Sequence, residues 1–184
     1  MINPAEHLGL LIIDLQSSLI SKTNDGSKLL NRCSFAIKAA LLLQCKIAIT
    51  EQSATKLGNI CDELRSILPE EIPVFSKNSF SAMDCPGIKK WIEDNQIEHL
   101  LLIGLESSIC IYQTAVQALS ENIGVTLLSD CIEERRIEDR HPVIQQLLTM
   151  DAHVLPSETI FYSLIGSAEH PKFNEFTKIV KQHS

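Results

Sequence analysis

The sequence predicts a three-layer α/β fold, with a six-stranded, mainly parallel sheet and helices on both of its faces. Short apolar runs alternate along the chain with longer amphipathic segments, which is the order of elements in parallel-sheet proteins. The apolar runs are continuous rather than alternately polar, as expected for strands that are covered on both sides. The chain has 184 residues, of which 45% are apolar, and this suits one globular domain spanning residues 1–184.

The predicted elements follow one another without a linker or an internal repeat. The strands are the runs 9–13, 47–49, 73–75, 99–103 and 125–128, with a weaker run at 153–155. The helices are the segments 27–44, 85–95, 108–122, 138–150 and 172–182. Helical spacing is clearest in 108–122, where Ile111, Ala115, Ala118 and Leu119 recur every three or four residues and Gly124 follows as a stop signal.

Charge and hydropathy argue against nucleic-acid and membrane partners. The formal net charge is -7, and the basic residues form no cluster longer than the pairs Lys89-Lys90 and Arg135-Arg136, which are typical of a solvated surface. The residues 1–7 lack the basic start of a secretory signal. The apolar run 8–13 is far shorter than the roughly 20 residues that span a bilayer. We therefore expect a cytoplasmic protein.

The cysteines are widely scattered along the chain, with no CxxC pair. They are Cys33, Cys45, Cys61, Cys85, Cys110 and Cys131. A chain of this size and apolar content does not need disulfides, so we expect reduced thiols. A buried structural role is the ordinary one for any single cysteine.

Polar side chains follow the predicted strands, at the sheet edge where ligands of parallel α/β proteins bind. These positions carry Asp14, Thr50-Glu51-Gln52, Ser76-Lys77, Gly104-Leu105-Glu106 and Asp130. Asp14 comes directly after five apolar residues, so its carboxylate needs a partner, and it is either a base or a cap of the next turn. Lys77 is either a solvated loop lysine or the partner of Asp14.

Cys110 is the third candidate, at the start of the segment 108–122. If Ser107 or Ser108 caps this helix, Cys110 lies in its first turn, where the helix dipole lowers a thiol pKa and backbone N–H groups can hold an oxyanion. The alternative is a core cysteine. The sequence has no GxGxxG, P-loop, GxSxG, HxH or HExxH pattern, so we expect no nucleotide cofactor and no metal.

Taken together, these patterns resemble the isochorismatase-like cysteine hydrolases over nearly the whole chain. The resemblance is carried by Asp14 in IDLQ, by Lys77 in SKNSFS and by Cys110 in GLESSIC, in that order along the chain. The stretches TEQ and LG, at 50–52 and 57–58, add to it, as do SE at 157–158 and HPKF at 170–173. The last features look most like the branch of isochorismatase-domain-containing proteins.

The resemblance implies a Rossmann-like fold, a catalytic triad and a self-associating protein. The triad is carried onto Asp14, Lys77 and Cys110, and a cis peptide is implied between Leu105 and Glu106. The expected oxyanion and substrate-binding residues are Glu106, Ser107, Ile109, Gln16, Gln52 and Phe80. The run 160–165 is a candidate surface for a dimer or higher oligomer, although such a run is more typical of a core.

The departures from the family pattern narrow the expected chemistry. Ser107 stands where the family usually has Thr, and Ser108 where the branch often has His. The metal-binding Asp-x-His pattern of nicotinamidases is replaced by 51–53, EQS, so we expect no metal and no nicotinamide substrate. Members that cleave vinyl ethers generally lack the cysteine.

The sequence therefore predicts a cysteine hydrolase that cleaves an amide-type C–N bond of a small molecule through a covalent acyl-enzyme. The alternatives are a vinyl-ether hydrolase of the isochorismatase type, and a non-catalytic protein that binds a small molecule or senses redox state through Cys110.

Overall fold

The computed structural model describes residues 5–183 and contains the predicted parallel sheet. The strands are β1 (Leu8–Ile13), β2 (Lys46–Gln52), β3 (Val74–Lys77), β4 (His99–Leu105), β5 (Gly124–Glu133) and β6 (His153–Leu155). Their spatial order is β3-β2-β1-β4-β5-β6, and every neighbouring pair is parallel. The expected six-stranded α/β architecture is confirmed.

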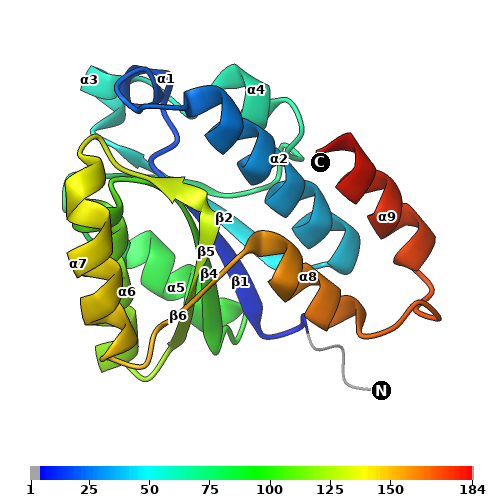
Figure 1. The fold of residues 1–184 in the computed structure, drawn as a ribbon. Coiled ribbons are helices and arrows are strands. Elements are labelled where there is room, and N and C mark those ends of the chain that lie inside the picture. The colour runs from blue at the N-terminus through cyan, green and yellow to red at the C-terminus, as the bar shows by residue number, and fades with distance from the viewer. Residues whose placement is uncertain (1–4, 184) are drawn as a thin grey trace.

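Helices cover both faces of the sheet (Figure 1). One face carries α2 (Gly26–Leu43), α8 (Ser157–Ile165) and α9 (Phe173–Gln182), and the other carries α5 (Pro86–Asp94), α6 (Tyr112–Ser120) and α7 (Ile137–Leu148). The short helical elements are α1 (Ser17–Ile20), α3 (Ala54–Leu57), α4 (Asp62–Arg65), η1 (Ala82–Asp84) and η2 (Ser107–Ile111). None of the helices within residues 5–183 is long and apolar enough to cross a membrane.

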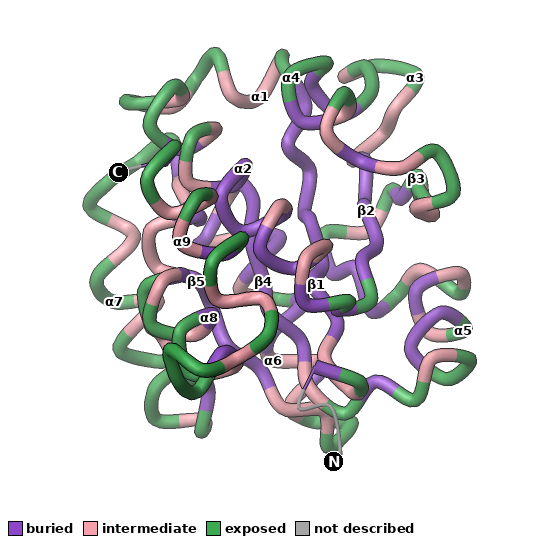
Figure 2. The backbone as a smooth tube through the Cα atoms, turned by 90° about the vertical axis from the view of Figure 1, so that its right-hand side faces the viewer, coloured by how far each residue is buried: buried purple, intermediate pink, exposed green. Residues whose placement is uncertain are grey.

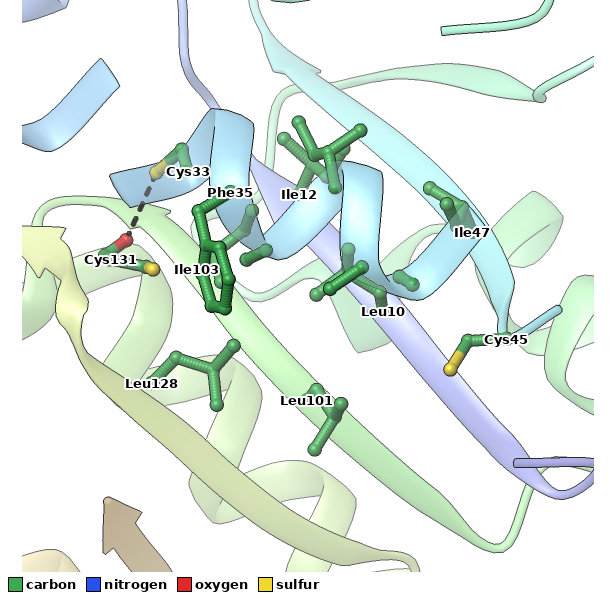
Figure 3. Packing of buried hydrophobic residues seen from close by; sticks show 14 of the residues in the cluster. Leu10, Ile12, Cys33, Phe35, Cys45, Ile47, Leu101, Ile103, Leu128 and Cys131 are labelled. Atoms are coloured by element: carbon green, nitrogen blue, oxygen red, sulfur yellow. Dashed lines mark hydrogen bonds between the residues drawn. The ribbon is translucent and has the colours of Figure 1, made fainter. Parts of the chain in front are cut away.

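Successive residues of the central strands feed two separate cores. In β1, Leu10 and Ile12 pack towards α2, whereas Leu11 and Ile13 pack towards the opposite helices. Figure 2 shows the central strands buried along their length, and Figure 3 shows Leu10, Ile12 and Ile47 under α2. Successive side chains of a strand point to opposite faces of the sheet, and both faces are buried here. Both sets of side chains are therefore apolar, which explains the continuous apolar runs in the sequence.

The apolar run 160–165 belongs to α8, a helix that the sequence analysis did not predict. Phe161 and Ile165 are buried in the α2-side core, whereas Tyr162 is exposed. Phe161 meets Phe35 of α2 edge to face, with 5.9 Å between the ring centroids. Ile160 and Leu164 are partly buried against the same core, so the run mainly packs inward.

The strand order reverses between β1 and β4, which places a crevice at their carboxyl ends. In a doubly wound sheet, the helices that follow the strands on either side of this point lie on opposite faces, and ligands bind in the gap. Asp14 follows β1, and the segment from Glu106 to Cys110 follows β4. The topology thus brings together Asp14 and Cys110, which are 96 positions apart in the sequence.

Gly104 allows β1 and β4 to approach each other at the edge of this crevice. Its φ of 138° is a backbone conformation that L side chains rarely adopt, and a Cβ atom here would lie 2.0 Å from the carbonyl oxygen of Ile13. The register of β4 against β5 also shifts between Leu102 and Gly104. Glycine is required at this position because both the conformation and the space exclude a side chain.

We predict that Gly104→Ala lowers the free energy of unfolding by at least about 3 kcal/mol, because strain and a backbone clash add together. Gly58→Ala is the matched control, since Gly58 also has a positive φ of 81° but open space around its Cβ position. The control is expected to cost about 1 kcal/mol. Urea denaturation of both variants measures the difference, and equal losses would contradict the steric argument.

Candidate active site

A buried ion pair joins the ends of β1 and β3. The Nζ atom of Lys77 donates to Oδ2 of Asp14 at 2.7 Å, and each side chain is only 1% exposed. The other carboxylate oxygen of Asp14 accepts a hydrogen bond of 2.9 Å from the hydroxyl of Thr50, at the end of β2. Both oxygens of Asp14 are thus held, so the orientation of its carboxylate is fixed.

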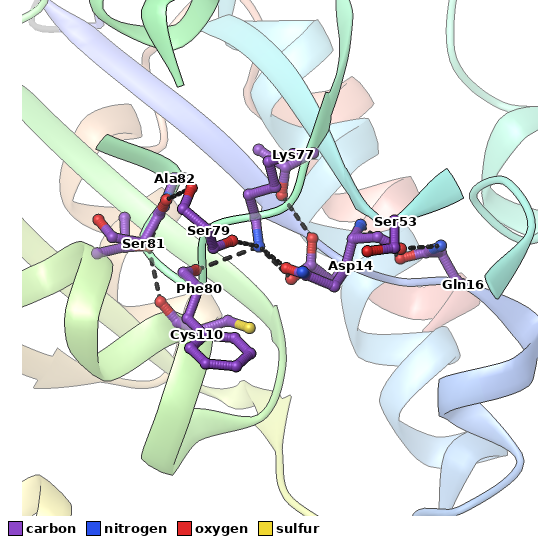
Figure 4. Close-up of polar contacts among 12 residues, drawn as sticks. Asp14, Gln16, Ser53, Lys77, Ser79, Phe80, Ser81, Ala82 and Cys110 are labelled. Carbon is purple, nitrogen blue, oxygen red and sulfur yellow. Dashed lines mark hydrogen bonds and ion pairs between the residues drawn. The ribbon is translucent and has the colours of Figure 1, made fainter. Parts of the chain in front are cut away.

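Lys77 also ties down the loop that follows β3. Its Nζ atom donates to Oε1 of Gln52 at 2.7 Å and to the carbonyl oxygens of Ser79 and Phe80 at 3.3 and 3.2 Å. Figure 4 shows these bonds radiating from the ammonium group. Of the two alternatives for Lys77, a solvated loop lysine or the partner of Asp14, this geometry agrees with the second.

Cys110 lies in η2, a single π-helical turn between β4 and α6, and is 5% exposed. Burial raises the pKa of the Cys110 thiol to about 12, and the nearby Asp14 carboxylate raises it further than the Lys77 ammonium lowers it. The expected lowering of this pKa by a helix dipole is therefore wrong. Desolvation and a neighbouring negative charge outweigh the dipole of one irregular turn, and the resting group is a protonated thiol.

The turn before Cys110 is formed by a left-handed residue rather than by a cis bond. Among residues 5–183 no peptide bond is cis, so the implied cis bond between Leu105 and Glu106 is wrong for this structure. Glu106 instead adopts φ 59° and ψ 63°, and its carbonyl oxygen accepts hydrogen bonds from the N–H groups of Ile109 and Ile111 at 2.9 and 3.3 Å. This conformation reverses the chain direction after β4 without a cis peptide.

A pocket of about 170 Å³ opens beside Cys110 and contains most of the predicted site residues. Its lining residues are Asp14, Leu19, Gln52, Leu57, Phe80, Glu106, Ile109, Cys110 and Arg135. Phe80 is 53% exposed and stands at the rim, with its side chain near Cys110 in Figure 4. The site thus combines a thiol, a fixed carboxylate and apolar walls.

Gln16 and Ser107, two predicted binding residues, lie behind the pocket wall. The amide group of Gln16 donates to the carbonyl oxygens of Gln52 and Gly58, and its oxygen accepts from the N–H of Gln52 at 2.8 Å. The Gln16 side chain therefore holds the backbone around Gln52 in place, and both its amide nitrogen and its amide oxygen are engaged in these hydrogen bonds. Ser107 does not cap a helix as expected, since its hydroxyl donates to Glu134 instead.

Leu19, Leu57 and Arg135 also line the pocket; the sequence suggested that the loops containing them shape it, but none of the three was named individually as a site residue. Arg135 was interpreted as solvated surface, and its side chain is 51% exposed, but it also forms an ion pair with Glu106 and lines the pocket. In the sequence analysis, the LG stretch at 57–58 was used only as part of the family resemblance and not as a sign of a pocket residue. None of the three residues carries a local pattern, so periodicity could not have identified them.

Asp130 follows the apolar part of β5, but it does not line this pocket and instead connects β5 to two helices. Its carboxylate accepts hydrogen bonds from Arg32 of α2 at 2.9 Å and from the N–H and hydroxyl of Ser157 in α8, both at 2.7 Å. Burial alone would raise its pKa, but these donors hold the pKa of Asp130 below its usual value. Asp130 thereby fixes two helices to the same strand.

Comparison with known proteins agrees with the fold and the family resemblance. Residues 9–159 match the model of the isochorismatase domain family. Isochorismatase domain-containing protein 2 of Bos taurus is 32% identical over 149 residues, which cover 80% of this chain and 71% of the relative.

Solved structures share the architecture over almost the entire chain. The MAR1 ribonuclease of Caenorhabditis elegans superposes with a TM-score of 0.90 at 29% identity, covering 98% of this chain and 92% of the other. YcaC from Pseudomonas aeruginosa, solved with hexane-2,5-diol and covalent acrylamide, has a TM-score of 0.90 at 17% identity. The shared regions are 97% of this chain and 89% of YcaC.

We predict that the rate of iodoacetamide alkylation at Cys110 rises with pH up to pH 10 without levelling off, because the thiol pKa is about 12. A free small-molecule thiol, with a pKa of about 8.5, levels off in the same range and serves as the reference. Peptide mapping by mass spectrometry assigns the modified residue. A plateau of the Cys110 rate below pH 8 would show that the thiol is acidic.

Proposed function

The chain belongs to the isochorismatase family, and from this we propose that it is a cysteine hydrolase for amide-type C–N bonds of small molecules. The observation that carries the proposal is that Cys110 and Asp14 line one small pocket, with the Asp14 carboxylate paired to the buried ammonium group of Lys77 behind it. A nucleophile, a base and a fixed cation can together support acyl transfer through a covalent intermediate.

The proposed first step is attack by Cys110 as Asp14 takes the proton of the thiol. Because the pKa of the thiol is raised to about 12, a stable thiolate is not available in advance, and the proton leaves as the sulfur–carbon bond forms. The carbonyl oxygen becomes an oxyanion. We propose that the N–H groups of Glu106 and Cys110, in the turn after β4, stabilise it.

The second half of the reaction reuses the same groups. Asp14 returns its proton to the departing nitrogen as the C–N bond breaks, which leaves a thioester on Cys110. Water then attacks the thioester with Asp14 as base, and the acid product and the free thiol are released. Lys77 holds the carboxylate in place through the 2.7 Å contact.

The pocket favours a small substrate with an apolar acyl group. Its volume of about 170 Å³ is below the roughly 300–1,000 Å³ of pockets for drug-sized ligands. Leu19, Leu57 and Ile109 supply apolar walls, while Gln52, Glu106 and Arg135 supply polar contacts. These features support a compact amide or carbamoyl compound.

Three other functions are less well supported. A redox sensor needs a thiol of low pKa, and the pKa of Cys110 is raised. A ribonuclease, the activity named for the Caenorhabditis elegans protein, is favoured by a basic surface, whereas the net charge here is -7. A vinyl-ether hydrolase would not require Cys110, so it is distinguished by mutation.

We also propose that the protein is cytoplasmic and self-associates. Phe80 at the pocket rim and Tyr162 on α8 are exposed aromatic side chains that an oligomer would cover. Light scattering of the purified protein measures its oligomeric state directly.

We predict that Cys110→Ala lowers kcat for small amide or carbamoyl substrates by at least about 10³-fold and leaves the melting temperature nearly unchanged. A panel of such compounds is incubated with wild type and variant, and intact-mass spectra are recorded during turnover. The wild type is expected to gain the mass of the acyl group, and the variant is not. Cys85→Ala is the matched control, because Cys85 is a free cysteine outside the pocket.

Full turnover by Cys110→Ala would overturn the nucleophile assignment and favour vinyl-ether cleavage. Loss of turnover without any covalent adduct would point to a role in binding instead.

We predict that Leu57→Ala shifts the preference towards longer acyl chains, because it enlarges the apolar side of the pocket. The ratio of kcat/KM for an acyl group one methylene longer is expected to rise by about 10-fold. Leu148→Ala, an exposed site on α7, is the control and should leave this ratio unchanged. The same ratio in all three proteins would remove Leu57 from the substrate site.

A further inference from the structure

Glu134 is a buried carboxyl group that the proposed mechanism does not use. It directly follows β5 and is 1% exposed, although it lies outside the pocket lining. Its Oε2 atom accepts a hydrogen bond from the hydroxyl of Ser107, which is completely buried. Ser107 is the first residue of the turn that contains Cys110.

Within residues 5–183, the other oxygen of Glu134 has no hydrogen-bond partner. Oε1 is buried, and the nearest cation, Nη1 of Arg140, is 3.7 Å away. Arg140 already donates to the backbone carbonyl oxygens of Ile132 and Ser129. Burial raises the pKa of Glu134, against the opposing effects of the Ser107 hydroxyl and Arg140. A half-satisfied buried carboxyl is costly, and such groups are concentrated at functional sites.

Two neighbouring contacts connect the same two segments. Ser107 is bound to Glu134, and the preceding residue, Glu106, is paired with Arg135. The side chain of Arg135 is 51% exposed, so solvent and salt weaken its pair, whereas the Ser107–Glu134 bond is shielded from water. The buried bond is therefore the firmer connection between the turn and the end of β5.

The turn needs such a connection because its backbone is unusual. Glu106 has a positive φ of 59°, and a π-helical turn follows it. Both conformations are sparsely populated and persist only when their surroundings hold them. The backbone N–H groups of this turn are the ones assigned to the oxyanion, so a small rotation of the turn would misdirect them.

We propose that Glu134 is a positioning residue that, through Ser107, holds the Cys110 turn in the orientation that stabilises an oxyanion. This inference rests on the proposed function, since it presumes that Cys110 is the nucleophile. Glu134 contacts neither the pocket nor the thiol, and its effect is transmitted by one hydrogen bond.

Two thiol reagents separate orientation of the turn from reactivity of the sulfur. When the Cys110 thiolate adds to acrylamide, a bond forms between sulfur and the β-carbon, and the π electrons move to the carbonyl oxygen. The resulting enolate is then protonated at its α-carbon, so this reaction requires stabilisation of an oxyanion. Iodoacetamide forms a sulfur–carbon bond and expels iodide without such a charge. The ratio of the two rates at Cys110, at pH 9, therefore reports on the oxyanion donors.

We expect Ser107→Ala and Glu134→Ala each to lower this ratio by about 10-fold, because misdirected donors stabilise the enolate less. The double variant should fall no further, since both residues act through one bond. Glu134→Gln keeps an oxygen acceptor for Ser107 and should remain within about threefold of wild type. Glu133→Gln is the matched control, an adjacent carboxylate outside the pocket, and should leave the ratio unchanged.

An unchanged ratio in Ser107→Ala and Glu134→Ala would overturn the inference while leaving the proposed function intact. Independent, multiplying effects in the double variant would overturn it too. If the wild type gains no acyl adduct on Cys110 during turnover, the proposed function itself fails and the inference fails with it. Should Glu134→Ala not fold, the comparison of Ser107→Ala with wild type still decides the outcome, with the melting temperature of each protein as the check on folding.

Discussion

The Asp14–Lys77 ion pair is the contact around which the proposed site is arranged. Two opposite charges are almost completely removed from water, and they compensate each other at 2.7 Å. Removing one partner of such a pair typically costs about 3–5 kcal/mol, because the other charge is left buried alone. The hydroxyl of Thr50, the amide oxygen of Gln52 and the carbonyl oxygens of Ser79 and Phe80 make further hydrogen bonds to the pair. The pair thereby joins the ends of β1, β2 and β3 and sets the geometry of the base.

Cys110, the proposed nucleophile, lies near this pair because of the sheet topology. β1 and β4 are neighbours at the point where the strand order reverses, so residues following them converge above one crevice. Gly104 permits the close contact with Ile13 that this arrangement needs. The raised pKa of Cys110 follows from the same geometry, since burial and the Asp14 carboxylate oppose a free thiolate. A protonated thiol is consistent with the proposed mechanism, in which the base takes the thiol proton while the sulfur attacks the carbonyl carbon.

The end of β5 supplies the other side of the site. Arg135 lines the pocket, and Glu134, outside it, accepts the hydrogen bond from Ser107 through which we propose that it positions the turn. Farther back, Asp130 fixes α2 and α8 to the same strand through Arg32 and Ser157. Asp130, Glu134 and Arg135 thus lie within six residues of one another but in three different environments. What each side chain does depends on its burial and its partners rather than on its residue type.

The sequence by itself determined the layer architecture and the triad candidates. Continuous apolar strands and amphipathic helices are local patterns, and residues after parallel strands must share one sheet edge. It did not determine the pKa of Cys110, the trans bond before Glu106 or the bond between Ser107 and Glu134. Only the tertiary structure decided these, because desolvation, backbone conformation and contacts between distant segments depend on what surrounds each residue in space.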